Sequence, residues 1–125
     1  MKRADVDELE KLMGQFKSIH AEVSALAKKS PNDAVNSFKI KFINTTVANC
    51  NKFFGQNYKP FEYFDVFDID DVPSNSDVTF IISQYIESLE KYRADNIKNN
   101  LGRWYFVLED TKEEIQTAQP VKLQK

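Results

Sequence analysis

Cysteine and histidine each occur once in this chain of 125 residues, as Cys50 and His20. A lone cysteine cannot form a disulfide within the chain, and structural zinc usually takes four cysteine or histidine ligands. A ferritin-like di-iron site needs two Glu-x-x-His pairs and therefore two histidines. The sequence therefore excludes an intrachain disulfide, a structural zinc site and a ferritin-like di-iron site built by one chain, and we expect no cofactor.

Long apolar runs and an excess of positive charge are also missing. No apolar stretch approaches the ~20 residues that a membrane-spanning helix needs. The opening stretch MKRADVDELEK alternates charges where a signal peptide has an apolar core. Seventeen basic and nineteen acidic side chains leave a formal charge of −2, without the broad positive field that attracts nucleic acids. We therefore expect a cytoplasmic protein that binds neither membranes nor nucleic acid.

Only three glycines and four prolines interrupt the chain, and all of them except Gly14 fall where regular elements should end. The length and a hydrophobic content of 42% suit one core. We predict a single helical domain over residues 1–119, followed by a flexible tail over residues 120–125.

Three stretches carry apolar side chains at spacings of three and four residues, the period of an amphipathic helix. The predicted helices cover residues 4–29, 31–54 and 74–97. Pro31 is expected at the first position of the second helix, and Ser74 or Ser76 is expected to cap the third. The pattern predicts an all-α fold, a small bundle of three long helices.

The apolar stripes are wide. On the first helix the stripe includes His20 as an inward position, and Gly14 marks either a close helix crossing or a tolerated surface glycine. On the second helix apolar residues, Phe38 and Phe42 among them, cover more than half of the circumference, which is typical of a central helix. Wide stripes also favour pairing of a helical face with a second copy, so a homodimer is expected.

The segment from residue 103 to residue 118 fits either a helix or a strand. Trp104, Val107 and Leu108 fit one face of a helix, whereas Trp104, Phe106 and Leu108 alternate as in a strand. The helix is the favoured alternative. If the segment is a strand, residues 59–71 are its expected partner.

Residues 59–71, KPFEYFDVFDIDD, contain four aromatic rings and five carboxylates between two predicted helices. An EF-hand loop starting at Asp68 fails because its sixth and twelfth positions are not glycine and glutamate. We interpret the segment as a long ordered strap whose rings cap the core, with a partner-binding edge and a metal loop as the alternatives. The candidate partner-binding residues are Tyr63, Phe64, Phe67, Asp68 and Trp104.

Two short motifs resemble parts of known enzymes. ESLE, with Glu87 and Glu90, is similar to the first Glu-x-x-Glu motif of all-α nucleotide pyrophosphohydrolases, and this resemblance implies magnesium on Glu87 and Glu90. Asp95, further along the same predicted helix, is the third candidate metal ligand. The second motif of that family is missing, because EDTKEE has only Asp110 and Glu113 three residues apart. YRADN resembles the start of an Arg-His motif in helical toxin-system ribonucleases, but no histidine follows Arg93.

The aromatic content, ten Phe, five Tyr and one Trp, exceeds what a three-helix core of this length needs. Exposed aromatic groups surrounded by charge are typical of protein-binding surfaces. The sequence therefore favours a non-catalytic helical module for protein–protein interaction, a subunit or regulator in a larger assembly. The alternative is a metal-dependent enzyme resembling the all-α nucleotide pyrophosphohydrolases, with carboxylates on its helices.

Overall fold

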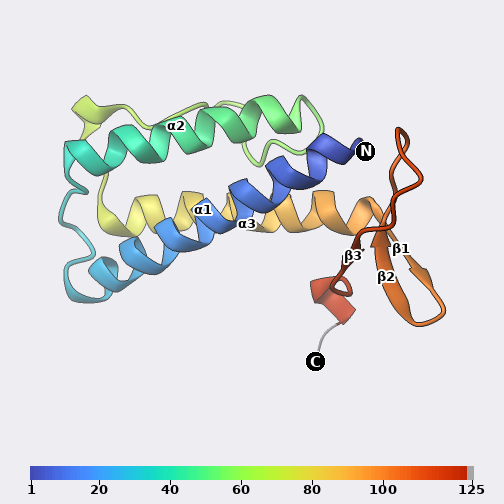
Figure 1. Ribbon diagram of the computed structural model, residues 1–125. Coiled ribbons are helices and arrows are strands. Elements are labelled where there is room, and N and C mark those ends of the chain that lie inside the picture. The colour runs from blue at the N-terminus through green and yellow to red at the C-terminus, as the bar shows by residue number, and fades with distance from the viewer. Residues whose placement is uncertain (124–125) are drawn as a thin grey trace.

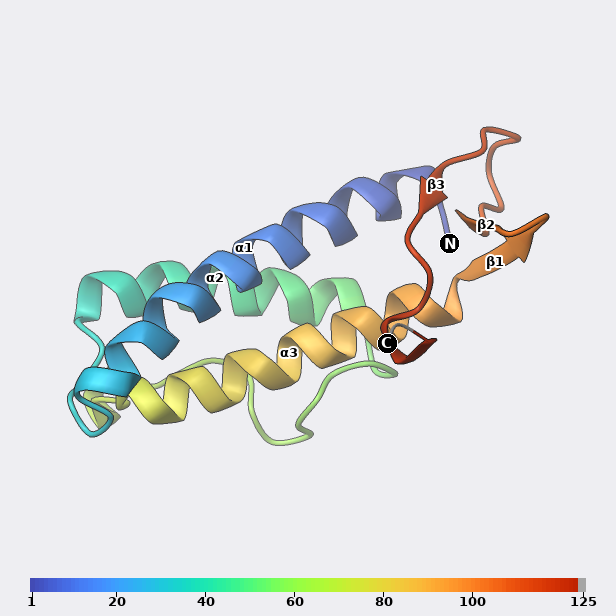
Figure 2. The ribbon, with the colours of Figure 1, turned by 90° about the horizontal axis from the view of Figure 1, so that it is seen from below.

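A computed structural model describes residues 1–123 of the chain. It contains three long helices, α1 (Arg3–Lys29), α2 (Ser37–Phe54) and α3 (Asn75–Asp95), and a small sheet. Helix α1 runs antiparallel to α2 and α3, and the sheet lies at the end of the bundle where α3 ends (Figures 1 and 2). The three-helix bundle is confirmed, whereas the purely all-α class is wrong because the chain also forms a sheet.

Helix α1 packs mainly against α3. Its buried residues include Leu9, Leu12 and Phe16, and the ring of Phe16 stacks on Tyr85 of α3 at 5.4 Å between centroids. Gly14 is exposed, and a methyl group built on it would meet nothing within 4 Å, so it marks no helix crossing. His20 is only half-buried and does not occupy a fully inward position.

Helix α2 begins six residues later than the sequence pattern predicts. Ser30 ends α1, and the side chain of Asn36, instead of a residue near Pro31, caps α2 by accepting from the backbone N–H of Lys39. The intervening backbone binds the start of α3: Val35 N–H donates to Pro73 O at 3.0 Å, and Asn75 N–H donates to Asp33 O at 2.8 Å. These long-range bonds hold the segment out of a helix.

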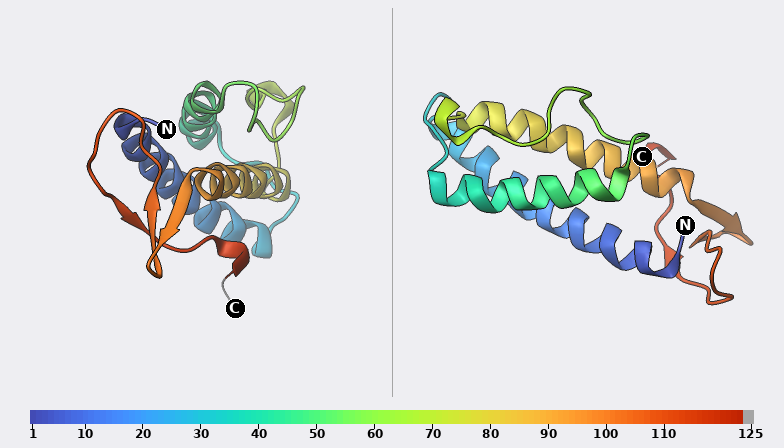
Figure 3. Two further views of the ribbon diagram at one scale, coloured as in Figure 1. Left: turned by 90° about the vertical axis from the view of Figure 1, so that its right-hand side faces the viewer. Right: turned by 90° about the horizontal axis from the view of Figure 1, so that it is seen from above.

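The prediction that α2 is the central helix is also wrong. Phe38 and Phe42 are 70% and 62% exposed, because α2 lies over the α1–α3 pair and leaves its outer side in solvent. The left view of Figure 3, which looks along the bundle, shows α2 on one side of the α1–α3 pair. Helix α3 begins as predicted, with Ser74 Oγ accepting from Asp77 N–H at 3.1 Å.

The segment after α3 forms strands instead of the favoured helix. Strands β1 (Ile97–Asn100), β2 (Arg103–Phe106) and β3 (Gln116–Thr117) make one antiparallel sheet in the order β1-β2-β3. Leu101 and Gly102 join β1 to β2 with positive φ angles of 54° and 84°, the conformation of a tight two-residue hairpin turn. Pairing of this strand with residues 59–71 is wrong too, because β1 and β3 are its partners.

Contacts with the N-terminus hold the segment after β2 against the bundle. The N-terminal amine of Met1 donates to Val107 O at 3.2 Å, and Glu109 N–H donates to Met1 O at 3.0 Å.

Within the predicted tail, residues Val121–Leu123 form the short 3₁₀ helix η2, and residues 124–125 lie outside the described part of the chain. Flexibility of residues 120–125 stays a prediction.

Among residues 1–123, no helix is both long enough and apolar enough to cross a membrane.

Candidate functional site

The strap, residues 59–71, runs back along α2 and is fixed to it by two asparagine side chains seven residues apart. The amide of Asn44 pairs with the backbone of Phe67 in both directions, at 2.8 and 2.9 Å. The amide nitrogen of Asn51 donates to Asp65 O at 2.9 Å, and its oxygen accepts from the hydroxyl of Tyr85 at 2.7 Å. Helix α2 therefore holds the middle of the strap directly, and Tyr85 of α3 fixes the side chain of Asn51.

The inner side of the strap consists of aromatic rings. Phe67 is buried, and the half-buried Phe64 contacts it edge-on at 5.0 Å between ring centroids. Phe64 also approaches Tyr85 at 6.4 Å, and Phe61 lies 6.1 Å from Phe80 of α3. Phe64 and Phe67 therefore cover the core where α2 and α3 lie side by side, as predicted for a strap.

Both ends of the connection are also held in place. Before the strap, the hydroxyl of Tyr58 donates to Asp95 at 2.8 Å, and its ring meets Tyr92 edge-on at 5.0 Å. After the strap, Ala34 and Ser74 form an antiparallel bridge. The short 3₁₀ helix η1 (Ile69–Asp71) lies beside the first turns of α2 (Figure 1). A connection fixed at both ends and in its middle presents its outer side as a stable surface.

The outer side of this connection carries apolar groups that the core does not use. Tyr63 is 95% exposed and Val72 60% exposed. Phe80 of α3, whose ring contacts Phe61, is 57% exposed. We call these exposed apolar residues together the strap face: Tyr63, Val66, Ile69, Val72 and Phe80.

The stretch of chain that contains most of the strap face is rich in carboxylates. Between Lys59 and Asp77 the sequence has one base, Lys59, whose ammonium group pairs with Asp65. Asp68 caps η1 by accepting from Asp70 N–H at 2.9 Å. The acids of this stretch are Glu62, Asp65, Asp68, Asp70, Asp71 and Asp77. The strap face is thus an apolar surface in a strongly acidic setting.

The predicted partner-binding residues do not form one cluster. Phe64 and Phe67 lie together and point inward, Tyr63 and Asp68 are exposed, and Trp104 is half-buried in β2 at the far end of α3. Phe67 is buried and Trp104 is remote, so neither belongs to the strap face.

Other members of the strap face were not singled out from the sequence. Phe80 lies off the four-three spacing of Val78, Ile82 and Tyr85, and that offset was a readable signal of exposure. No pattern in the sequence distinguishes Val66 and Val72 from buried valines, because only the path of the strap exposes them.

Two of the three carboxylates suggested by the ESLE motif are engaged in other contacts. Glu90 pairs with Arg93, Asp95 accepts from Tyr58, and Glu87 is exposed. Within residues 1–123, no group of three or more His, Cys, Asp or Glu side chains is placed to hold a metal ion. We therefore do not place the candidate site on these residues.

The buried titratable groups of the core are poorly suited to chemistry. Burial raises the pKa of the Cys50 thiol, so this side chain stays protonated and is a weak nucleophile. Burial likewise raises the pKa of the Tyr85 hydroxyl. Both groups behave as parts of the core.

Comparison of the chain with protein-family models, with curated proteins and with solved structures found no match.

Proposed function

We propose that this chain is a non-catalytic protein-interaction module whose binding surface is the strap face. The observation that carries the proposal is an exposed apolar surface on a segment that is held rigidly to the bundle. A preformed surface loses little conformational entropy on binding, which favours affinity. Burial of exposed apolar groups such as Tyr63 and Val72 against a partner contributes favourably to the free energy of binding.

The acidic surroundings define the chemistry of the partner. Six carboxylates and one lysine between Lys59 and Asp77 generate a negative potential around the apolar residues. Complementary charge steers association and disfavours acidic partners. The partner is therefore a protein segment with an apolar stripe and lysine or arginine on its flanks, for example a basic amphipathic helix.

A defined peptide pair tests this proposal. The probes are an amphipathic helix of leucine and lysine and the same helix with glutamate at every lysine. We expect the basic peptide alone to shift the backbone amide resonances of residues 61–73 in an NMR titration. The interaction should weaken as salt is added, because the charges involved are exposed.

Two double variants decide where the peptide binds. Tyr63→Ser with Val72→Ser removes exposed apolar area and should weaken binding of the basic peptide about tenfold without lowering stability. Leu101→Ser with Val107→Ser removes exposed apolar groups near the sheet and serves as the matched control. Equal binding of both peptides, shifts centred on the hairpin, or no binding at roughly millimolar peptide would refute the proposal.

The exposed ring pair on α2 supports the homodimer that the wide stripes predict. Phe38 and Phe42 contact each other edge-on at 5.0 Å and lie one helical turn apart. A second copy pairing through the same face would bury both rings. Light scattering should report a mass above 14.5 kDa at high concentration, and Phe38→Ser with Phe42→Ser should return the monomer. A monomeric wild type at all concentrations would remove the dimer while leaving the strap-face proposal intact.

A further inference from the structure

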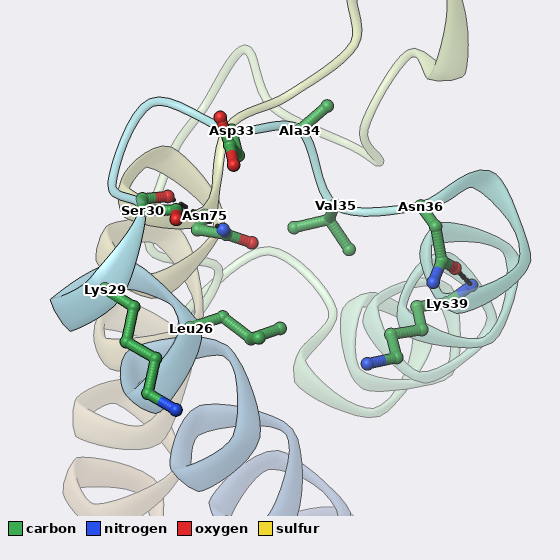
Figure 4. Close-up of a pocket in the computed structure, with 9 residues that line it drawn as sticks. All are labelled: Leu26, Lys29, Ser30, Asp33, Ala34, Val35, Asn36, Lys39 and Asn75. Carbon is green, nitrogen blue, oxygen red and sulfur yellow. Dashed lines mark hydrogen bonds between the residues drawn. The ribbon is translucent and has the colours of Figure 1, made fainter.

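A pocket lies at the end of the bundle where α1 ends and α2 and α3 begin (Figure 4). Its volume is about 320 Å³, the lower end of the range for small-molecule sites. It lies beyond the C-terminal end of the strap, and none of the strap-face residues lines it. The lining residues are Leu26, Lys29, Ser30, Asp33, Ala34, Val35, Asn36, Lys39 and Asn75.

Asn75 is the unusual member of this lining. Its side chain is almost fully buried, with 4% exposed, and its amide nitrogen donates to Ser30 O at 2.9 Å. Its amide oxygen is buried and has no hydrogen-bond partner among the described residues. Figure 4 shows that oxygen on the side of Val35, toward the space between the lining residues. A buried acceptor without a donor is unfavourable, so the pocket is suited to a group that carries an N–H or O–H.

Charged side chains define the rest of the ligand. Lys29 from α1 and Lys39 from α2 line the pocket, while Asp33 is the one acid in the lining. Lys39 also pairs with Glu22 across the α1–α2 interface, which holds its ammonium group in place. Glu22 balances the charge of Lys39, so the preference for an anionic group over a simple cation depends on Lys29 and on the positive end of the helix dipole at the first turn of α2.

We propose that this pocket binds a small organic acid that carries an amino or hydroxyl donor beside a short apolar chain. The donor bonds to the amide oxygen of Asn75, and the carboxylate lies near Lys29 and Lys39. The apolar chain packs on Leu26 and Val35. This site is separate from the strap face and does not depend on the protein-interaction function. The competing occupant is a water molecule, which satisfies the Asn75 oxygen without any ligand.

Four related probes separate the contributions of the donor and of the carboxylate. L-leucine and 2-hydroxy-4-methylpentanoate have the donor, the carboxylate and the apolar chain. The probe 4-methylpentanoate lacks the donor, and 3-methylbutylamine lacks the carboxylate. Binding is followed by NMR through the backbone amides of residues 29–36 and 75, at probe concentrations up to roughly 20 mM. We expect the first two probes to bind about tenfold more tightly than either truncated one.

Lysine variants then test the anion contact without touching the buried asparagine. Lys29→Gln with Lys39→Gln should weaken binding of L-leucine at least about fivefold. The matched control, Lys28→Gln with Lys41→Gln, removes the same charge from exposed lysines outside the pocket and should leave binding unchanged. Thermal unfolding of both double variants is measured first to verify that they fold.

Three results would overturn the proposal. The absence of shifts with every probe would leave water as the only occupant. Equal binding of L-leucine and 4-methylpentanoate would show that the Asn75 oxygen does not recognise a donor. An equal loss of binding in both lysine pairs would show that net charge, and not this pocket, attracts the acid.

Discussion

The side-chain amide of Asn44 pairs with the backbone of Phe67 as a neighbouring strand would. Its nitrogen donates to Phe67 O at 2.8 Å, and its oxygen accepts from Phe67 N–H at 2.9 Å. One side chain thus satisfies both backbone groups of a residue that lies in no strand. The strap can follow α2 closely because its partly buried backbone keeps these partners.

Replacing Asn44 should detach the middle of the strap. Asn44→Ala leaves both backbone groups of Phe67 without their partners, and we expect a loss of about 2 to 4 kcal/mol in unfolding free energy, measured by urea denaturation. Asn49→Ala is the matched control, because Asn49 is exposed on the same helix and should change stability by less than ~0.5 kcal/mol. Equal effects of both variants would show that the Asn44 pairing contributes nothing specific.

Substitutions of Phe67 and of Tyr63 should differ strongly in their effect on stability. Phe67 is 7% exposed and contacts Phe64, so Phe67→Ala should cost about 3 to 5 kcal/mol, as truncation of buried phenylalanine does. Tyr63 is 95% exposed, and Tyr63→Ala should change stability by less than ~0.5 kcal/mol. Denaturant midpoints of the two variants check both values. A stable Phe67→Ala protein would contradict the capping role of the strap.

Gly14 should be a stabilising site for substitution. It lies in the middle of α1, its position is exposed, and an added methyl group meets no neighbour within 4 Å. Alanine has the higher helix propensity, so Gly14→Ala should raise the unfolding free energy by about 1 kcal/mol. A decrease in the thermal midpoint would show that a contact on this face of α1, such as a second chain, needs the glycine.

These cases show how far sequence reasoning reaches. The three helices and the Ser74 cap follow from local patterns, because helical spacing and capping depend on residues a few positions apart. A polar strip containing Asn44 and Asn51 is visible on α2, but the backbone that it binds lies fourteen or more residues away. The spacing of residues along α2 therefore does not reveal which distant backbone groups the two asparagines bind.

The errors have the same physical origin. Residues 31–36 are held outside α2 by backbone hydrogen bonds to residues 73–76. Helix propensity depends on neighbouring residues only, so it cannot predict these long-range bonds. Phe38 and Phe42 have the same side chain as the buried Phe54, and only the arrangement of three helices decides which rings are covered. In the sheet, the preference of Trp104 and Phe106 for strands prevailed over the helix-compatible spacing once β1 was present as a partner.

Alkaline pH should destabilise the fold through three of its tyrosines. Burial raises the pKa of Tyr85 and of Tyr92, and a hydrogen bond to Asp95 raises that of Tyr58. Below pH ~10 folded and unfolded chains are both protonated at these groups, so their contribution to stability is complete. As pH rises further, the unfolded chain releases protons that the folded chain retains, and the unfolding free energy falls.

The variant Tyr85→Phe tests this mechanism. At neutral pH this variant should be about 1 kcal/mol less stable than the wild type, because it lacks the hydrogen bond to Asn51. Above pH ~10 its stability should fall less steeply than that of the wild type. Ile82→Val is the control, because it removes a buried methyl group of α3 and no titrating group, and it should keep the wild-type slope. Urea midpoints across the alkaline range provide the comparison. Identical slopes in wild type and Tyr85→Phe would show that Tyr85 does not contribute to the alkaline loss.

Arg93 joins the C-terminal segment to the bundle. Its guanidinium group pairs with Glu90 one turn earlier on α3, and the two side chains are only 12% and 19% exposed. It also donates to Thr117 Oγ1 at 2.9 Å, to Ala118 O at 2.7 Å and to Gln119 O at 3.0 Å. The planar fork of arginine suits these several acceptors, whereas lysine presents a single ammonium group.

Removing Arg93 should therefore release the segment around β3 and destabilise the whole chain. In Arg93→Ala the partly buried carboxylate of Glu90 loses its counter-ion, and we expect a loss of about 2 to 4 kcal/mol, with Arg93→Lys between this variant and wild type. Trypsin should also cleave after Lys112 faster in Arg93→Ala than in wild type, because the following strand is no longer held against α3. Arg103→Ala removes an exposed arginine of β2 and is the control for both measurements. If Arg93→Ala unfolds and is cleaved like Arg103→Ala, the contacts of Arg93 with residues 117–119 do not stabilise the sheet.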